Sequence, residues 1–312
     1  MQSLVSVIMP AYNAEEYIGE AISSILSQTY EKLELIVVED CSTDNTIGQI
    51  DKYRDDNRIV VIKNPVNKGI SYSTNTGIGT AKGKYIALLD DDDMAAVNRI
   101  ELQVDYLEKH PEIDILGGWT EIIDSAGNHM GYYAQPRTNP KYIKALLLFG
   151  WWGFGNGTTM IRRDFLEESG LRYEDNCYGI QDLRFFMKAS KIGTISAIPD
   201  LLLYKREHGK NESDYRHEKY GIERDETYRR FRTESLKESG IDLKEMEYAT
   251  LNDLLSDLNV EKKISDLEIL YGLLRKILVQ AKQKADFYKE LEHVCRKMLV
   301  DYLMQVYSFS DI

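Results

Sequence analysis

The chain has 312 residues, of which 43% are hydrophobic and 29% charged, as is typical of a folded protein with one domain and an appendage, or with two domains. This composition excludes a disordered or collagen-like chain. The 39 Lys and Arg residues against 51 Asp and Glu residues give a net charge of −12, so a nucleic-acid backbone is repelled on average and nucleic acid is not expected as a partner.

Nothing in the sequence indicates export or a membrane span. The first residues, Met1 to Pro10, become strand-like at once and lack a basic region, an apolar core and a cleavage site, so we expect no secretion signal. The longest apolar stretch, around Ala145 to Phe154, falls short of the roughly 18 apolar residues of a spanning helix. The three cysteines are far apart and form no CxxC pair, which argues against disulfides and zinc. We therefore expect a cytoplasmic protein, with any membrane contact peripheral to the inner face.

In the first third of the chain, short apolar runs alternate with amphipathic stretches, which predicts parallel strands joined by helices. The predicted elements, in chain order, are a strand at Val5–Met9, a helix at Glu15–Ser27, a strand at Leu33–Val38, a helix from Thr43 or Asp44 toward Tyr53, a strand at Ile59–Ile62, a helix at Ser71–Ala81 and a strand at Tyr85–Leu89. These elements predict an α/β sandwich. Ligands of open α/β sheets bind beyond the carboxyl ends of the strands, so the loops there are the expected place of chemistry.

The pattern changes along the rest of the chain. The next predicted elements are a helix at Val97–His110, a strand at Ile113–Trp119, a hairpin turning at Ser125–Asn128, short strands between Thr158 and Arg206, and a helix at Asp182–Lys191. After about Gly209 the sequence predicts only charged helices, at 214–239, 242–258, 264–280 and 284–307. We therefore predict a catalytic domain at 1–210 and a helical region at 211–312, which packs on that domain or on a second subunit in a homo-oligomer.

Four consecutive carboxylates, Asp90 to Asp93, follow the predicted strand that ends at Leu89. Their mutual repulsion is costly without a cation, and carboxylate oxygens suit Mg²⁺ or Mn²⁺, which complete their shells with substrate phosphates. The alternative is an acidic, solvated turn. A calcium loop of the EF-hand type is excluded because the required glycine and glutamate are not at their positions.

A second pair of acidic residues, Glu39 and Asp40, ends another predicted strand. A carboxylate there can accept a hydrogen bond from the N–H of a pyrimidine or guanine ring, and Tyr12, just after the first strand, can cover the face of that ring. Each residue also has a structural explanation, as a solvated edge or a packing residue. Together they indicate a nucleotide pocket.

Several stretches of the chain occur in the order and spacing of motifs of the family 2 glycosyltransferases. These stretches are Val5–Asn13, Glu39–Asp44, Asn67–Gly69 with Asn75–Gly77, Leu89–Met94, Gly179–Arg184 and Tyr204–His208. The resemblance covers roughly residues 3 to 210 and implies the GT-A fold, a Rossmann-like α/β/α sandwich, here followed by a C-terminal helical extension. It leaves the sugar undecided.

The resemblance also implies roles for individual residues on the donor side. Asp40 would hold the base of a nucleotide-diphosphate sugar, with Pro10 and Tyr12 near the ring. Asp90 and Asp92 would form the DxD motif, with Asp92 as the ligand of Mn²⁺ or Mg²⁺, which would offset the charge on the leaving diphosphate.

The resemblance implies that Asp182 is the general base of an inverting transfer without a covalent intermediate. The sequence alone reads Asp182 equally well as a helix N-cap, and the two roles are compatible. Arg206 and His208 share one face of a strand and could approach the diphosphate or its metal, or form a structural pair. Trp151 and Trp152 are candidates for an acceptor platform that stacks on sugar, or for core packing.

Three positions depart from the family's usual pattern: Glu39 replaces an aspartate, Thr74 an arginine and Gln181 a glutamate. None removes an expected metal ligand or base. The expected function is metal-dependent, inverting transfer of a sugar, from a UDP-sugar above other donors, to a hydroxyl of a glycan or lipid-linked acceptor in surface polysaccharide biosynthesis.

Two other functions remain open from the sequence. A non-catalytic protein that binds sugar nucleotides and assembles through its helical tail would keep the pocket without the reaction. A sugar nucleotidyltransferase would need a glycine-rich phosphate loop after the first strand, which Pro10–Glu15 does not supply. A dehydrogenase is a poor match because the glycines of Gly77–Gly83 have the wrong spacing and follow a helix.

Overall fold

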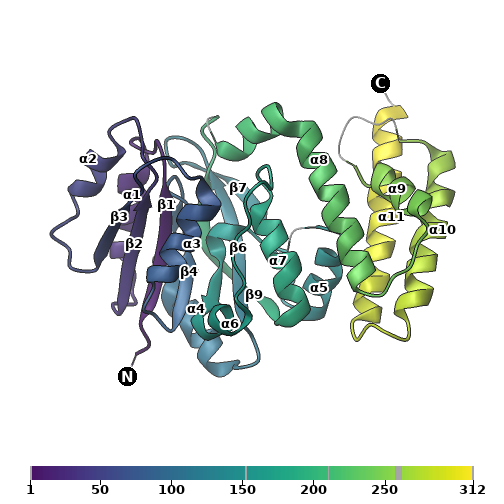
Figure 1. Cartoon of the computed structure of the whole chain (residues 1–312), viewed down its shortest axis with the longest axis horizontal. Coiled ribbons are helices and arrows are strands. Elements are labelled where there is room, and N and C mark those ends of the chain that lie inside the picture. Colours follow the sequence, from purple (N-terminus) through teal and green to yellow (C-terminus); the bar gives the residue numbers. More distant parts are fainter. Residues whose placement is uncertain (1, 152, 210, 257–261, 311–312) are drawn as a thin grey trace. The chain divides into compact units, whose positions relative to one another are not determined.

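The computed structural model describes residues 2–151, 153–209, 211–256 and 262–310, with side chains undescribed at 132–133, 212–218 and 307–310 (Figure 1). The chain forms two compact units. The first comprises Met1–Pro140, Gly153–Asn176 and Lys188–Asn211, and the second comprises Lys141–Trp152, Cys177–Met187 and Glu212–Ile312.

A mixed sheet forms the centre of the first unit. Its strands are β1 (Val5–Ala11), β2 (Leu33–Glu39), β3 (Ile59–Lys63), β4 (Tyr85–Leu88), β5 (Met94–Ala95), β6 (Ile115–Ile123), β7 (His129–Ala134), β8 (Met160–Arg162) and β9 (Ile195–Arg206). They lie in the order β3-β2-β1-β4-β8-β6-β9-β5, and β7 pairs with β6. The strands β3, β2, β1 and β4 are parallel, whereas β8 is antiparallel to β4 and β6.

Helices cover both faces of the parallel part of the sheet. The helices of the first unit are α1 (Ile18–Leu26), α2 (Thr46–Asp51), α3 (Ile70–Thr80), α4 (Arg99–Lys109) and α6 (Arg163–Ser169), with a 3₁₀ turn at Asn156–Thr158. On one face, Val7 and Met9 of β1 share a buried core with Ile22 of α1 and Ile100 of α4. The opposite face of β1 meets α3, because a Cβ on Gly77 would lie 2.4 Å from Ile8. The expected α/β/α sandwich is confirmed.

The second unit is helical. Its elements are α5 (Pro140–Leu148), the first half of α7 (Gln181–Ile192), α8 (Glu212–Glu238), α9 (Glu245–Leu254), α10 (Ile264–Ala281) and α11 (Tyr288–Ser310). Leu148 and Phe149 are buried in one cluster with Leu274 of α10 and Val294 of α11. The segment around α5 therefore shares its hydrophobic core with the C-terminal helices, although more than 60 residues separate them in the chain.

The helices and strands predicted in the first third of the chain are confirmed to within a few residues at their ends. The two-residue strand β5 and the helices α5 and α6 have no counterpart in the prediction. Across the described residues, none of the helices combines the length and the apolar character that crossing a membrane requires.

Candidate functional site

The parallel pairing of β1 with β2 and β4 brings three polar loops to one edge of the sheet. Ala11 is paired with Glu39, and Ile8 with Leu88, so the loops after these strands start side by side. The Asp40 N–H donates to the Ala11 carbonyl (2.8 Å), which continues the pairing one residue past the strand. Tyr12, Asp40 and the acidic loop 90–93 therefore lie at the carboxyl edge of the sheet, where the sequence analysis predicts the ligand-binding loops.

Asp40 is 3% exposed, and its carboxylate is already engaged by the protein. It accepts hydrogen bonds from the Asn64 amide (2.6 Å) and from the backbone N–H groups of Lys68 (2.9 Å) and Gly69 (2.7 Å). Gly69 has φ of +86°, a conformation that favours glycine, and directly precedes α3. A carboxylate offers about four acceptor positions, so these bonds occupy most of them and tie the loop 64–69 to β2.

The loops after β1 and β2 are fastened to each other. The Thr43 N–H donates to the Asn13 side-chain oxygen (2.8 Å), and the Asn13 N–H donates to the Ser42 hydroxyl (3.1 Å). At the start of α2, the Asp44 carboxylate accepts a hydrogen bond from the N–H of Thr46 (3.0 Å). Burial raises the pKa of Asp44, but hydrogen bonds from Thr46 and Glu15 outweigh this effect, so the pKa is lowered overall. Tyr12, 46% exposed, follows β1 with its side chain accessible at this edge.

The four aspartates of the acidic loop have different surroundings. Asp91 accepts the Tyr12 N–H (3.0 Å), and Asp93, 3% exposed, accepts the Arg206 N–H (2.9 Å). Burial, followed by repulsion from Asp92 and Asp90, raises the pKa of Asp93 well above its usual range. Asp90, Asp91 and Asp92 are half-buried, and the Asp92 side chain is 24% exposed. Asp91 and Asp93 hold the loop by accepting backbone N–H groups of other segments, whereas the Asp92 side chain keeps part of its surface accessible.

A fully buried cation, Arg99 of α4, accompanies this loop. It donates to the carbonyls of Leu88 (2.9 Å) and Thr159 (3.3 Å) and to the Gln103 side chain (3.1 Å). Burial lowers the pKa of Arg99 to about 9, opposed by attraction to Asp90 and Asp93, so it stays positively charged at neutral pH. Its charge partly offsets the repulsion within the loop.

Asp92, His208 and Asn211 converge on one point. The His208 Nε2 lies 3.1 Å from the Asp92 Oδ2, and the Asn211 amide donates to the same oxygen (3.3 Å). The Asn211 side-chain oxygen accepts a hydrogen bond from the backbone N–H of His208 (3.0 Å), which fixes the two residues relative to each other. The His208 ring stacks on Tyr17 with centroids 4.8 Å apart.

The chemistry of this cluster fits a divalent cation. A carboxylate oxygen is the ligand that Mg²⁺ and Mn²⁺ prefer, and imidazole nitrogen is a common additional ligand. Among the residues that the structure describes, no group of three or more His, Cys, Asp or Glu side chains is arranged to hold a metal by itself. Asp92 and His208 would therefore supply only part of the shell, and substrate oxygens the remainder.

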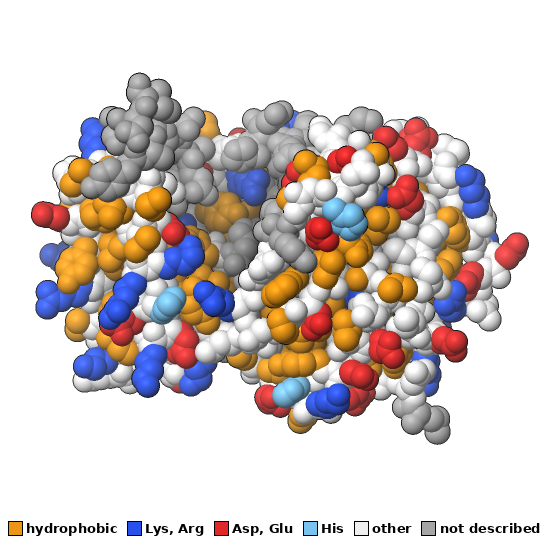
Figure 2. All heavy atoms as spheres, turned by 180° about the vertical axis from the view of Figure 1, so that it is seen from behind, with side chains coloured by type: hydrophobic (Ala, Val, Ile, Leu, Met, Phe, Trp, Pro, Cys, Tyr) orange, Lys and Arg blue, Asp and Glu red, His pale blue; other side chains and the backbone are white. Residues whose placement is uncertain are grey.

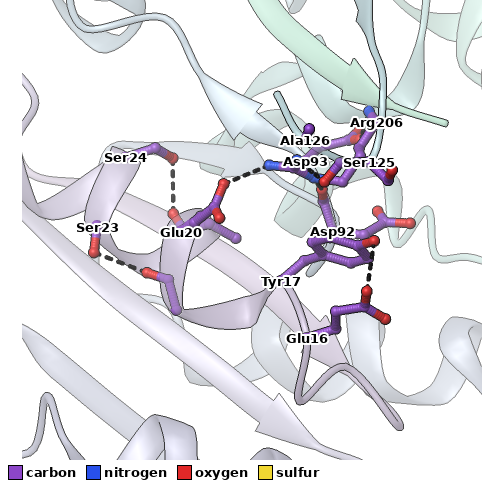
Figure 3. A network of polar contacts seen from close by, with 12 residues as sticks. Glu16, Tyr17, Glu20, Ser23, Ser24, Asp92, Asp93, Ser125, Ala126 and Arg206 are labelled. Carbon is purple, nitrogen blue, oxygen red and sulfur yellow. Dashed lines mark hydrogen bonds and ion pairs between the residues drawn. The ribbon is translucent and has the colours of Figure 1, made fainter. Parts of the chain in front are cut away.

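Arg206 lies next to this cluster, but its guanidinium points into the protein, where the side chain is 1% exposed (Figure 3). It contacts Glu20 of α1 and backbone carbonyls of the acidic loop and the β6–β7 turn. The sequence predicts that Arg206 and His208 share one face of a strand, but β9 ends at Arg206, so His208 lies two residues past the strand. Of the two side chains, it is His208 that contacts the Asp92 carboxylate.

Asp182 and Trp151 belong to the second unit. Asp182 is half-buried in the first turn of α7, and its side-chain oxygen lies 2.9 Å from the Leu183 N–H. Trp151 packs half-buried against the helical core, with the Lys297 ammonium 5.5 Å from the centre of its ring. Trp152 lies outside the described residues. Their functional roles stay predictions.

Three residues of the site did not emerge from the sequence: Tyr17, Glu20 and Asn211. Asn211 follows His208 by three residues, and this short spacing was the available signal. Tyr17 and Glu20 are also three residues apart, which places them on one side of α1, but nothing in that pattern points to Arg206, 186 residues beyond Glu20.

Comparison with known proteins gives consistent matches. The sequence model of glycosyl transferase family 2 matches residues 6–170. An uncharacterized glycosyltransferase of Haemophilus influenzae is 34% identical over 264 residues, which cover 80% of each chain. The UDP-Glc:alpha-D-GlcNAc-diphosphoundecaprenol beta-1,3-glucosyltransferase WfgD of Escherichia coli is 34% identical over 62% of this chain and 73% of its own. The structure of S. aureus TarS 1-349 in complex with UDP-GlcNAc superposes with a TM-score of 0.63 at 20% identity, over 98% of this chain and 91% of the other.

Proposed function

Because this chain belongs to glycosyl transferase family 2, and is therefore a glycosyltransferase, we propose that it transfers a sugar from a UDP-sugar to a hydroxyl of a glycan or lipid-linked acceptor, with inversion and with the help of a divalent metal. The GT-A fold with C-terminal helices, expected from the sequence, is confirmed. The observation that carries the proposal is the convergence of Asp92, His208 and Asn211 at the carboxyl edge of the sheet.

The metal part of the proposal rests on the Asp92–His208 pair. We infer that the Asp92 carboxylate and the His208 imidazole hold Mn²⁺ or Mg²⁺, while Asn211 orients both side chains. When bound, the metal supplies positive charge to the diphosphate that leaves with the nucleoside. Asp91 and Asp93 accept the backbone N–H groups of Tyr12 and Arg206, which keeps the loop in place, so these two residues act on the site through its backbone.

The donor part rests on the loops around Tyr12 and Asp40. We propose that the exposed side chain of Tyr12 covers the base, near Pro10 of β1 and Asp90 of the adjoining loop. The Asp40 carboxylate already accepts hydrogen bonds from the N–H groups of Lys68 and Gly69. The proposed hydrogen bond from the base to Asp40 therefore uses an acceptor position that these bonds leave open. The name of the relative WfgD includes UDP-Glc, and TarS was solved with UDP-GlcNAc, which supports uridine over other bases.

For the acceptor, we propose that Asp182 removes the proton from the attacking hydroxyl. Its support is its motif, Gly179–Arg184, and its half-buried position in the first turn of α7. Trp151 remains the candidate for stacking on acceptor sugar, against a role in packing the helical core. A lipid-linked acceptor, as in the name of WfgD, would bring the protein to the inner face of a membrane.

An assay of product release tests this function. The protein is incubated with UDP-glucose or UDP-GlcNAc, with Mn²⁺, and with or without a panel of sugar and lipid-diphosphate sugar acceptors. Acceptor-dependent release of UDP supports glycosyl transfer. Release of no nucleotide with any acceptor favours a protein that only binds sugar nucleotides, and formation of UDP-sugar from UTP and a sugar phosphate identifies a nucleotidyltransferase.

A further inference from the structure

Arg206 is one of the most deeply buried large side chains of the described chain, and it carries a full positive charge. Its Nη2 donates to a carboxylate oxygen of Glu20 (2.6 Å), its Nε to the Asp92 carbonyl (3.1 Å), and its Nη1 to the Ser125 carbonyl (3.2 Å). Figure 3 shows the guanidinium pointing toward Glu20 on α1, with the acidic loop beside it. These acceptors come from three separate segments of the first unit.

The backbone of Arg206 is used as well. Its N–H donates to the Asp93 carboxylate (2.9 Å), and its carbonyl accepts the Asn211 amide (2.8 Å). One residue thus holds the main chain of Asp92, the side chain of Asp93 and the side chain of Asn211. Each of these groups adjoins the Asp92 carboxylate, to which the proposed function assigns the metal.

Tyr17 joins the same arrangement from α1. Its ring lies 4.6 Å from the Arg206 guanidinium carbon and 4.8 Å from the centre of the His208 ring. Stacking on a single aromatic ring fixes the positions of two side chains, one from the last residue of β9 and one from two residues beyond it. The segment that begins α1 therefore sets the positions of both Arg206 and His208.

A buried guanidinium with these partners has little capacity left for a substrate phosphate. All three guanidinium nitrogens of Arg206 donate hydrogen bonds to groups of the protein. The carboxylate of Glu20, whose side chain is 57% exposed, balances the positive charge. Removing a buried cation from such partners would leave them unsatisfied, so a direct contact with the donor would require the network to break.

We propose that Arg206 is a positioning residue and that Glu20 is its anchor: the ion pair between them holds the Asp92 backbone so that the Asp92 carboxylate and the His208 imidazole are preorganised for the divalent cation. This inference rests on the proposed function. In the proposed function, Glu20 binds neither the metal nor the donor. The inference nevertheless predicts that changing Glu20 alters the affinity for the metal.

The test uses Glu20, because truncating Arg206 itself leaves buried acceptors unpaired and endangers folding. Glu20→Ala removes both the charge and the acceptor, whereas Glu20→Gln removes the charge but retains an oxygen that can accept from Arg206. The affinity of the full chain for Mn²⁺ is measured by calorimetry in the presence of UDP, together with the melting temperature of each variant.

A control variant addresses general loss of structure. Glu108→Ala breaks the Lys84–Glu108 ion pair, in which the glutamate side chain is 44% exposed. Glu108 also accepts from Ser3, ahead of β1, and Lys84 precedes β4, so this pair lies at the edge of the sheet opposite the site. We expect Glu108→Ala to bind Mn²⁺ like the wild type.

We expect Glu20→Ala to bind Mn²⁺ about 10-fold more weakly than the wild type. Glu20→Gln should lose clearly less affinity than Glu20→Ala. The melting temperatures of both variants should equal that of the wild type. Wild-type affinity in Glu20→Ala would overturn the inference, as would a loss of affinity in Glu108→Ala as large as the loss in Glu20→Ala. Metal-independent UDP binding by the wild type would instead overturn the proposed metal site together with this inference.

Discussion

Chemically identical carboxylates of the site have different surroundings. Asp92 is half-buried with an imidazole beside it, whereas Asp40, Asp91 and Asp93 accept backbone N–H groups. Sequence alone can indicate a DxD motif, but it cannot distinguish these surroundings, because they depend on partners such as Arg206 and Lys68 that lie far away in the chain.

Asp182 provides the sharpest test of the acceptor side. Replacing it by the isosteric asparagine, Asp182→Asn, removes the base while keeping the shape of the first turn of α7. We expect turnover to fall by roughly 10²- to 10⁴-fold, the usual contribution of a general base, with the affinity for UDP and Mn²⁺ unchanged. Steady-state kinetics and calorimetry on the same sample measure the two quantities, and near-wild-type turnover would show that another group is the base.

The cysteines differ in accessibility. Cys41 is exposed, whereas Cys177 and Cys295 are buried, and burial raises the pKa of the Cys295 thiol to about 12. The thiolate is the reactive form, so the buried Cys295 thiol stays protonated and unreactive at neutral pH. We expect a thiol reagent to label Cys41 alone in the native protein at pH 7 to 9, and all three cysteines after denaturation. Mass spectrometry locates the label, and rapid native labelling of Cys295 would contradict the packing of α11.

At the element scale, the contact between α3 and β1 depends on glycine at one position. A Cβ on Gly77 would lie 2.4 Å from the Ile8 side chain, whereas a Cβ on Gly79 of the same helix meets nothing within 4 Å. We expect Gly77→Ala to destabilise the protein by about 1–3 kcal/mol through overpacking, and Gly79→Ala to stabilise it by up to about 1 kcal/mol through helix propensity. Urea unfolding compares the pair, and equal effects would show that α3 does not pack on β1 in this way.

Most elements of the first unit could be predicted because their signals are local. Ile18, Ile22 and Ile25 recur at helical spacing, and the run Leu33–Val38 is apolar apart from Glu34, so each segment indicates its own structure. β5 could not be found in this way: Met94 and Ala95 form a strand only because β9 pairs with them. Likewise, the apolar residues around Leu148 gave no sign of α5 as a part of the helical unit.

At the scale of the whole molecule, the second unit draws its core from separate stretches of the chain. The last break between the units lies at Asn211 and Glu212, and residues 141–152 and 177–187 group with the C-terminal helices. Phe149 is fully buried in the helical cluster, and its carbonyl accepts a hydrogen bond from Arg232 of α8 (2.8 Å). Such contacts between distant segments cannot be read from hydrophobic periodicity.

This organisation predicts the effect of a truncation. A chain that ends at Asn211 lacks α8 to α11, so Leu148 and Phe149 lose the side chains that bury them. We expect this chain to bind a hydrophobic dye, to melt at a lower temperature than the full chain, and to be cleaved by protease near 141–152. Melting and protease resistance equal to those of the full chain would show that residues 1–210 form a domain that folds on its own.

The net charge of −12 opposes general attraction between this chain and an anion. Figure 2 shows acidic and basic side chains interspersed over the face in view, among patches of hydrophobic side chains. We therefore expect recognition of an anionic donor to depend on local groups at the carboxyl edge, with the proposed cation among them, and not on general attraction. For this reason we propose that donor binding requires the metal.

The most direct test of that claim is calorimetric binding of UDP to the wild-type chain, with GDP and dTDP as comparators, each with and without Mn²⁺. We expect UDP to bind more tightly than the other two nucleotides, only in the presence of Mn²⁺, and Asp92→Ala to lose the manganese-dependent binding. Absence of binding for all three nucleotides under both conditions, or UDP binding of equal strength without the metal, would contradict the assignment of Asp92 and His208 as a metal site.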